Sequence, residues 1–123
     1  MEKGKKLRVD KKVEKEDSAS SYGSGLLDVF STPAMIALME KSAHLLAKSM
    51  LASNQDTVGT EVNIKHLRAT PVGEMVYAEA LLTEINGRAL TFEVSAFDQK
   101  GEIGKGIHTR YIIDPEKFMN KLN

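Results

Sequence analysis

The chain has 123 residues, 28% of them charged, and its formal net charge is zero. This length suits one core, so we predict a single domain over residues 1–123 whose first part, 1–25, is a strand or a loop. The balanced charge gives no electrostatic reason to expect binding to nucleic acid or to an anionic membrane. Because the chain has no cysteine, disulfides, a thiolate nucleophile and thiolate zinc sites are excluded.

The distribution of apolar residues bears on where the protein is found. No run of about 18 consecutive apolar residues is present, as a membrane-spanning helix would need. The segment that begins at Met1 is charged and lacks the apolar stretch of a signal peptide. We therefore expect a cytoplasmic protein without a membrane partner.

The N-terminal quarter of the chain is mostly polar. Its charged beginning predicts either a short edge strand near Lys6–Glu16 or a solvated arm. The segment from Ser18 to Gly25 is rich in Ser and Gly, which predicts a loop. Leu26–Phe30 is a short apolar segment that leads to Thr32, and it predicts either a turn of helix or a lid over a pocket.

The stretch from Pro33 to about Ala52 predicts one helix that is apolar on most of its sides. A helix without a broad polar stripe is a buried helix. Thr32 can cap its first turn, and Pro33 suits the first helical position because its missing N–H would be unpaired there. Glu40 lies inside this stretch, where an unpaired carboxylate costs free energy.

After a polar break, apolar and polar residues alternate with period two, which predicts strands. We expect these strands over Val58–Arg68, Glu74–Ile85, Arg88–Phe97 and Ile103–Asp114. Asn86-Gly87 is a strong signal for a two-residue hairpin. Turns are expected at 70–73 and 98–101, and Asp114-Pro115 predicts a short terminal helix that reaches Leu122.

This order predicts an α+β fold in which a four-stranded antiparallel meander wraps around the long helix. One sheet covers a helix on only some of its sides, and 123 residues provide no second layer. We therefore expect a second copy of the chain to cover the remainder. An antiparallel sheet curled around a central helix and paired with a twin is the hotdog fold.

Three polar side chains lie where apolar residues are expected or where an element ends, namely Thr32, Glu40 and His66. Each has an ordinary explanation. Thr32 can be a helix cap, Glu40 can lie on a narrow polar strip, and His66 can be a core residue on the same strand face as Val62 and Ile64. As a set, a hydroxyl, a carboxylate and an imidazole are the components of an activated-nucleophile site. Eight helical residues separate Thr32 from Glu40 by about 12 Å, so direct contact needs a bent helix, a partner subunit or a substrate between them.

Other candidate residues give weaker signals. Gly104 and Gly106 lack the spacing and the strand–loop–helix setting of a phosphate loop, and such strand glycines more often mark a bulge or a close backbone approach. The three histidines are too scattered for a metal motif, so we expect no metal. Arg110 can hold a carboxylate or phosphate, or form a salt bridge at the rim of the sheet.

Several short runs recur together in one known family. They are Val29-Phe30-Ser31-Thr32-Pro33-Ala34-Met35, Leu38-Met39-Glu40, Val58-Gly59-Thr60, His66 with Ala69-Thr70-Pro71, Gly87-Arg88, and Gly104-Lys105-Gly106-Ile107-His108-Thr109-Arg110. With these runs in the same order over about 26–118, the chain resembles the fluoroacetyl-CoA thioesterase-like branch of the hotdog thioesterases. The segment before Leu26, which shapes the acyl pocket in relatives, does not clearly match.

The resemblance implies a catalytic set of Thr32, Glu40 and His66, with Gly59 lining the substrate site and Arg110 contacting substrate or coenzyme A. It implies an acyl-CoA thioesterase in general and does not identify the acyl group; our hypothesis is that the substrate is a small acyl-CoA, with no cofactor other than the coenzyme A of the substrate. The homodimer expected from the uncovered sides of the helix can also pair into a dimer of dimers. Two alternatives remain open at this point: a module that binds acyl-CoA without cleaving it, and a hotdog enoyl-CoA hydratase. The family's selectivity for the fluoroacetyl group does not follow from these residues.

Overall fold

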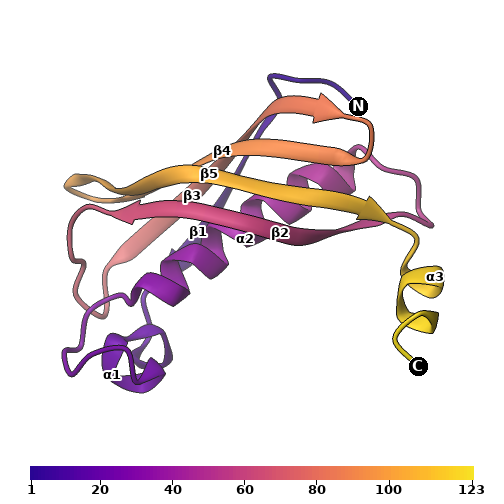
Figure 1. Cartoon of the computed structure of the whole chain (residues 1–123). Helices are drawn as coiled ribbons and strands as arrows, with labels where there is room; N and C mark the ends of the chain where they lie inside the picture. Colours follow the sequence, from indigo (N-terminus) through magenta and orange to yellow (C-terminus); the bar gives the residue numbers. More distant parts are fainter.

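A long helix, α2, lies along one face of a five-stranded antiparallel sheet in the computed structural model, which describes residues 1–123 (Figure 1). The predicted α+β class and the wrapped-helix arrangement are therefore confirmed. The elements are β1 Lys6–Lys12, the 3₁₀ turn η1 Lys15–Asp17, α1 Ala19–Tyr22, α2 Thr32–Ser49, β2 Asp56–His66, β3 Met75–Asn86, β4 Ala89–Asp98, β5 Gly101–Ile113 and α3 Pro115–Asn120.

The sheet order is β1-β3-β4-β5-β2, so the prediction of a four-stranded meander is wrong in one respect. Only β3, β4 and β5 follow one another as hairpins, while β2 pairs with β5 at the far edge and β1 pairs with β3. The connection over 67–74 is long enough to cross the sheet, because eight residues reach about 26 Å when extended. A two-residue turn, as at Asn86-Gly87, would have forced β2 and β3 to be neighbours.

The first turn of α2 is capped by Ser31 and not by Thr32, which corrects the sequence-based assignment. The Ser31 hydroxyl accepts a hydrogen bond from the Ala34 amide, and Thr32 is the first helical residue, followed by Pro33. Ser31 is buried, whereas Thr32 is exposed. The physical consequence is that the Thr32 hydroxyl is not needed for capping and can bond elsewhere.

Burial of α2 is one-sided within the protomer. Its sheet-facing side includes Met35, Leu38 and Met39, each less than 5% exposed. On the opposite side Ala37, Lys41 and Leu45 are exposed, and the helix ends at Ser49, three residues before the predicted end. The sheet therefore covers one side of this apolar helix and leaves the other to solvent or to another chain.

No helix of the protein has the length and apolar character needed to span a membrane.

The sheet contributes the other half of the core through one face of β4, as the alternation predicted. Leu90, Phe92, Val94 and Ala96 are all 2% exposed or less.

In β5, two glycines allow other groups to approach the backbone closely. A Cβ on Gly104 would lie 2.5 Å from the sulfur of Met35, and one on Gly106 would lie 2.0 Å from the Asn63 carbonyl oxygen. The interpretation of these glycines as points of close approach is confirmed.

The N-terminal region contains more structure than the loop predicted for Ser18–Gly25. The strand alternative is confirmed for Lys6–Lys12, and residues 19–22 form the short helix α1 with Ser18 as its cap. The Ser18 hydroxyl accepts from the Ser21 amide, which is why a serine-rich stretch forms a helical turn here. Isolated bridges Ser18–Phe30 and Val29–Pro71 place this segment at the end of the sheet where α2 begins (Figure 1).

Candidate active site

At the start of α2, the Thr32 hydroxyl oxygen lies 2.8 Å from Nδ1 of His66, at the end of β2. The contact forms because Ser31 caps the helix and leaves the Thr32 side chain free to turn toward the strand. The other imidazole nitrogen of His66, Nε2, is buried and has no hydrogen-bond partner within the protomer. With Nδ1 as the acceptor, this pair has the geometry of a base that can take a proton from a hydroxyl group.

The Thr32–His66 pair lines a hollow of about 520 Å³. Its walls come from α1, from the segment leading into α2, and from the residues that follow β2. They are Ala19, Ser24, Val29, Phe30, Ser31, Thr32, His66, Leu67, Arg68 and Ala69. Part of the wall is anchored by Asp98, which accepts hydrogen bonds from Arg68 and Thr70. Although burial opposes this effect, these hydrogen bonds lower the pKa of Asp98 to about 2. The hydroxyl–imidazole pair therefore faces a space that can admit a small ligand.

A second polar cluster lies two turns further along α2, around Glu40. The carboxylate Oε2 of Glu40 lies 4.0 Å from Nε2 of His108 on β5, and the Glu40 side chain is 42% exposed. Gly59 of the edge strand β2 lies directly beside it. A Cβ on Gly59 would lie 3.0 Å from Glu40 Oε2, 3.2 Å from His108 Cε1 and 3.4 Å from Arg110 Nη1. Gly59 therefore lets three polar side chains converge on the backbone of β2.

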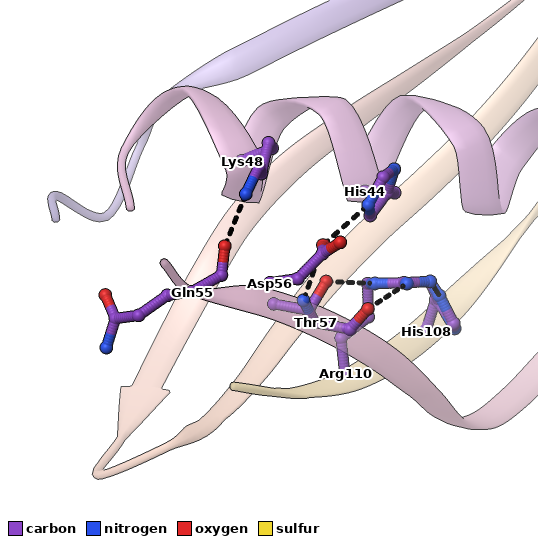
Figure 2. A network of polar contacts seen from close by, with 7 residues as sticks. All are labelled: His44, Lys48, Gln55, Asp56, Thr57, His108 and Arg110. Carbon is purple, nitrogen blue, oxygen red and sulfur yellow. Dashed lines mark hydrogen bonds and ion pairs between the residues drawn. The ribbon is translucent and has the colours of Figure 1, made fainter. Parts of the chain in front are cut away.

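Arg110 is 7% exposed and is held by three hydrogen bonds (Figure 2). Its Nε donates to the Thr57 hydroxyl at 2.7 Å, Nη2 donates to the Thr57 carbonyl at 3.0 Å, and Nη1 donates to Nε2 of His108 at 3.1 Å. The neighbouring Asp56 carboxylate contacts His44 of α2 at 2.7 Å, so the start of β2 is tied to the helix (Figure 2). A buried cation is fixed in one orientation by this network.

The electrostatics of the two clusters follow from burial. Burial lowers the pKa of His66 and the pKa of His108, which favours the neutral imidazole in both. The pKa of Arg110 is also lowered by burial, while the negative charges of Glu40 and Asp56 oppose the shift. A guanidinium stays charged despite such a shift because its ordinary pKa is so high. Hence the first cluster is neutral, and the second contains a buried cation beside a carboxylate.

Comparison with known proteins gives this geometry a context. The family described as fluoroacetyl-CoA-specific thioesterase (FlK) matches residues 13–116. The fluoroacetyl-CoA thioesterase of Streptantibioticus cattleyicolor is 38% identical over 95 residues, which cover 77% of this chain and 68% of that protein. The chain belongs to the FlK thioesterase family. It is therefore a homologue of a thioester hydrolase, and the family predicted from the sequence runs is confirmed.

Solved structures agree with the FlK assignment. A solved structure of the fluoroacetyl-CoA thioesterase FlK matches with a TM-score of 0.92 and 32% identity, over 99% of this chain and 95% of that one. A threonine-to-serine mutant of FlK in complex with acetyl-CoA matches with a TM-score of 0.93 and 31% identity, over 99% and 96%. A thioesterase superfamily member from Thermus thermophilus has a TM-score of 0.90 at 21% identity, covering 98% and 90%. A hot-dog-like protein from Thermanaerovibrio acidaminovorans also matches, with a TM-score of 0.89 at 20% identity over 98% and 89% of the two chains, so the hotdog fold is confirmed.

The structure of this FlK-family chain separates the predicted residues into two groups. Thr32 and His66 are hydrogen-bonded, as an activated hydroxyl requires. Glu40 forms no hydrogen bond or ion pair with either of them in the protomer, and its nearest titratable partner is His108. Gly59 and Arg110 belong to the Glu40 cluster. No group of three or more acidic, histidine or cysteine side chains converges as metal ligands would.

Sequence reasoning did not assign a role to His108 or Thr57, the two residues that orient Arg110. The signal for His108 was available, since the alternation in β5 puts residues two apart on the same face and Arg110 was already a candidate. Nothing local pointed to Thr57. It contacts Arg110 only because β2 pairs with β5, setting Thr57 opposite Ile112 and Gly59 opposite Arg110. That pairing was the part of the topology that the meander prediction missed.

Proposed function

We propose that this FlK-family protein hydrolyses the thioester of a small acyl-CoA, using Thr32, Glu40 and His66. The observation that carries the proposal is the 2.8 Å contact between Thr32 Oγ1 and His66 Nδ1 beside the hollow at the start of α2. The FlK relative that binds acetyl-CoA supports a short acyl group. Coenzyme A enters as part of the substrate, and the proposed chemistry requires no other cofactor.

His66 is the general base of the proposed reaction. Its lowered pKa keeps the imidazole neutral at physiological pH, so Nδ1 can accept a proton from Thr32 or from a water molecule that Thr32 positions. The new carbon–oxygen bond forms as the thioester carbonyl is attacked. The carbon–sulfur bond then breaks, and the departing thiolate takes the proton from His66. If water is the attacking group, this step releases the carboxylic acid. If Thr32 is the attacking group, the acyl group is left as an ester on Thr32, and a water molecule that loses its proton to His66 then hydrolyses this ester and frees Thr32. Attack by Glu40 itself through an anhydride is the competing route.

The developing oxyanion needs a donor near the start of α2. Two features of the first turn limit the choice: the Ala34 amide already donates to Ser31, and Pro33 has no N–H. The Thr32 amide is therefore the first-turn N–H that has no intrahelical or capping acceptor and can stabilise the oxyanion. It has the favourable partial charge of a helix N-terminus.

We propose that Glu40 acts across a homodimer. Glu40 lies about 12 Å along α2 from Thr32, and Gly59 lies about 20 Å along β2 from His66. Strand β2 is an open edge that is exposed from Gly59 to Asn63, and such an edge can pair with another chain. A two-fold axis near Val62 and Asn63 would set Gly59 of one protomer opposite His66 of the partner subunit.

This dimer would combine the two clusters into two equivalent sites. Each site would use Thr32 and His66 from one protomer, with Glu40, Gly59 and Arg110 from the other. The Glu40 carboxylate would orient a water molecule or the buried Nε2 of His66, which lacks a partner within its own chain. Arg110 and Gly59 would contact the acyl group or coenzyme A. A dimer of dimers and a cytoplasmic location are compatible with this arrangement and remain predictions.

The proposal is tested by assaying the purified protein with acetyl-, propionyl- and longer acyl-CoA substrates and following the release of free thiol. We expect turnover to be highest with the short acyl groups. Binding of coenzyme A esters without thiol release would instead identify an acyl-CoA-binding module. Loss of the enoyl thioester absorbance without thiol release would identify a hydratase. Either of these results would contradict the proposed function.

A further inference from the structure

Two opposite charges meet at Gly59 without forming an ion pair. The Glu40 oxygen and the Arg110 Nη1 approach the same Cβ position of Gly59, at 3.0 Å and 3.4 Å. A carboxylate and a guanidinium this close to a common point normally pair, since charge-assisted hydrogen bonds are strong at a partly buried site. No contact within 4.0 Å joins them, and the basic side chain nearest to Glu40 Oε2 is the neutral imidazole of His108, whose Nε2 lies 4.0 Å away. Some feature of the protein therefore holds the guanidinium away from the carboxylate.

His108 is the residue that restrains the Nη1 group of Arg110. Thr57 binds the guanidinium on the side of Nε and Nη2, which leaves Nη1 as the group that faces Glu40. Nε2 of His108 accepts a hydrogen bond from this Nη1 at 3.1 Å. The direction of the contact is fixed by chemistry because a guanidinium can only donate.

The hydrogen bond at Nδ1 of His108 keeps Nε2 unprotonated, so Nε2 remains a hydrogen-bond acceptor. Nδ1 of His108 lies 2.8 Å from the carbonyl oxygen of Glu61, which can only accept, so the ring proton is on Nδ1. Nε2 of the neutral ring is then an unprotonated acceptor directed at Arg110. The ring is 1% exposed, which leaves it no freedom to turn. The Glu61 carbonyl thus sets the tautomer, and the tautomer sets the orientation of the cation.

We propose that His108 is a positioning residue that holds Arg110 away from Glu40 and so keeps the Glu40 carboxylate free to act on the substrate. The inference rests on the proposed hydrolysis and extends it to a residue that touches neither substrate nor reacting atoms. Without the Nε2 acceptor, Nη1 turns to the nearest anion, which is Glu40. The carboxylate is then bound in an ion pair beside Gly59.

Two substitutions of nearly equal size separate this role from a packing role. In His108→Gln, the side-chain oxygen reaches about as far as Nε2 and can accept from Arg110. In His108→Asn, the shorter amide reaches about as far as Nδ1. It can donate a hydrogen bond to the Glu61 carbonyl but cannot accept one from Arg110. We expect His108→Gln to keep kcat within about threefold and His108→Asn to lower kcat and kcat/KM together by about ten- to a hundredfold. The opposite ranking would show that anchoring to Glu61 is what matters and would overturn the proposal.

A double-mutant cycle with Arg110→Met tests whether His108 acts through Arg110. We expect His108→Asn to have almost no further effect on kcat in the Arg110→Met background, because no guanidinium remains to capture Glu40. Additive losses would overturn the proposal. So would failure of both His108 variants to fold, which would assign His108 to the core. Absence of thiol release from the wild-type protein would be a different result, because it contradicts the hydrolysis itself.

Discussion

The two polar clusters beside α2 differ in charge, burial and completeness. The cluster at the first turn consists of the neutral pair Thr32 and His66, which faces a hollow and leaves one imidazole nitrogen without a partner. The cluster two turns later contains the buried cation Arg110, whose guanidinium donates three hydrogen bonds, and the half-exposed carboxylate of Glu40.

The difference teaches that neither cluster alone contains the hydroxyl, imidazole and carboxylate that the proposed hydrolysis uses. The first cluster has an imidazole and a hydroxyl but no carboxylate that could orient the imidazole as the proposed base. The second has a carboxylate, but its only histidine is bonded to Glu61 and Arg110. Each therefore contains what the other lacks. Five predictions test this complementarity, beginning with the largest expected effect.

Removal of the proposed base, His66, should affect activity most. We expect His66→Ala to lower kcat by about a hundredfold or more, the scale of lost acid–base catalysis. Thiol release from acetyl-CoA measures the effect, and thermal unfolding checks that the variant folds. Lys65→Ala is the matched control, because this neighbour is exposed and alternation along β2 directs its side chain to the opposite face of the sheet. A variant of His66 that unfolds while Lys65→Ala is unaffected would favour a core role for His66.

Mixing two inactive variants should restore activity if the clusters combine across a dimer. Glu40→Gln and His66→Ala are each expected to be nearly inactive. In a co-expressed equal mixture, half of the dimers would be mixed, and each would contain one intact site. We therefore expect about a quarter of the wild-type activity. Recovery of none would place the complete site within one protomer.

The neighbours Ser31 and Thr32 should affect different properties. Thr32→Val removes the hydroxyl bonded to His66, so we expect kcat to fall about tenfold if Thr32 positions water. A fall beyond about a thousandfold would identify Thr32 as the nucleophile. Ser31→Ala removes the helix cap, and we expect it to lower the free energy of unfolding by about 1 kcal/mol. Denaturant unfolding and thiol release, measured on both variants, separate the two roles.

Gly59→Ala should perturb the second cluster without unfolding the protein. The added methyl would lie 3.0 Å from the flexible Glu40 side chain and 3.2 Å from the His108 ring, so both side chains must shift by a few tenths of an ångström. We expect a severalfold loss of kcat with little change in melting temperature. Gly106→Ala is the contrasting variant, because its methyl would meet backbone atoms of β2 and should destabilise the fold severely. Equal melting temperatures for the two variants would contradict this distinction.

The smallest effect is on the pH dependence of stability. Burial lowers the pKa of both His66 and His108 below the unfolded value of 6.5. Below pH 6.5 the unfolded chain therefore binds more protons than the folded one, and stability falls as the pH decreases toward the folded pKa values. We expect the free energy of unfolding to drop between pH 7 and pH 5, and to drop less in His108→Gln. Urea unfolding at several pH values measures the slope.

The sequence alone determined most of the secondary structure and the family. Period-two alternation placed β3, β4 and β5 with boundaries within two residues, and the apolar stretch after Pro33 placed α2. The short runs around Thr32, Glu40 and His66 indicated the family that the comparisons confirm. These features are local: strand alternation, hairpin turns and helix-starting residues are properties of neighbouring positions along the chain.

The tertiary structure decided the relations between distant residues. It placed β2 beside β5 rather than β3, and this pairing brings Thr57 and Gly59 to Arg110. It assigned the helix cap to Ser31 and so freed Thr32 for His66. It also placed Glu40 beside His108, apart from Thr32 and His66, with which the sequence analysis had grouped it. No local pattern encodes these results, because strand order and side-chain contacts depend on which elements pack together and not on the spacing of residues within each element.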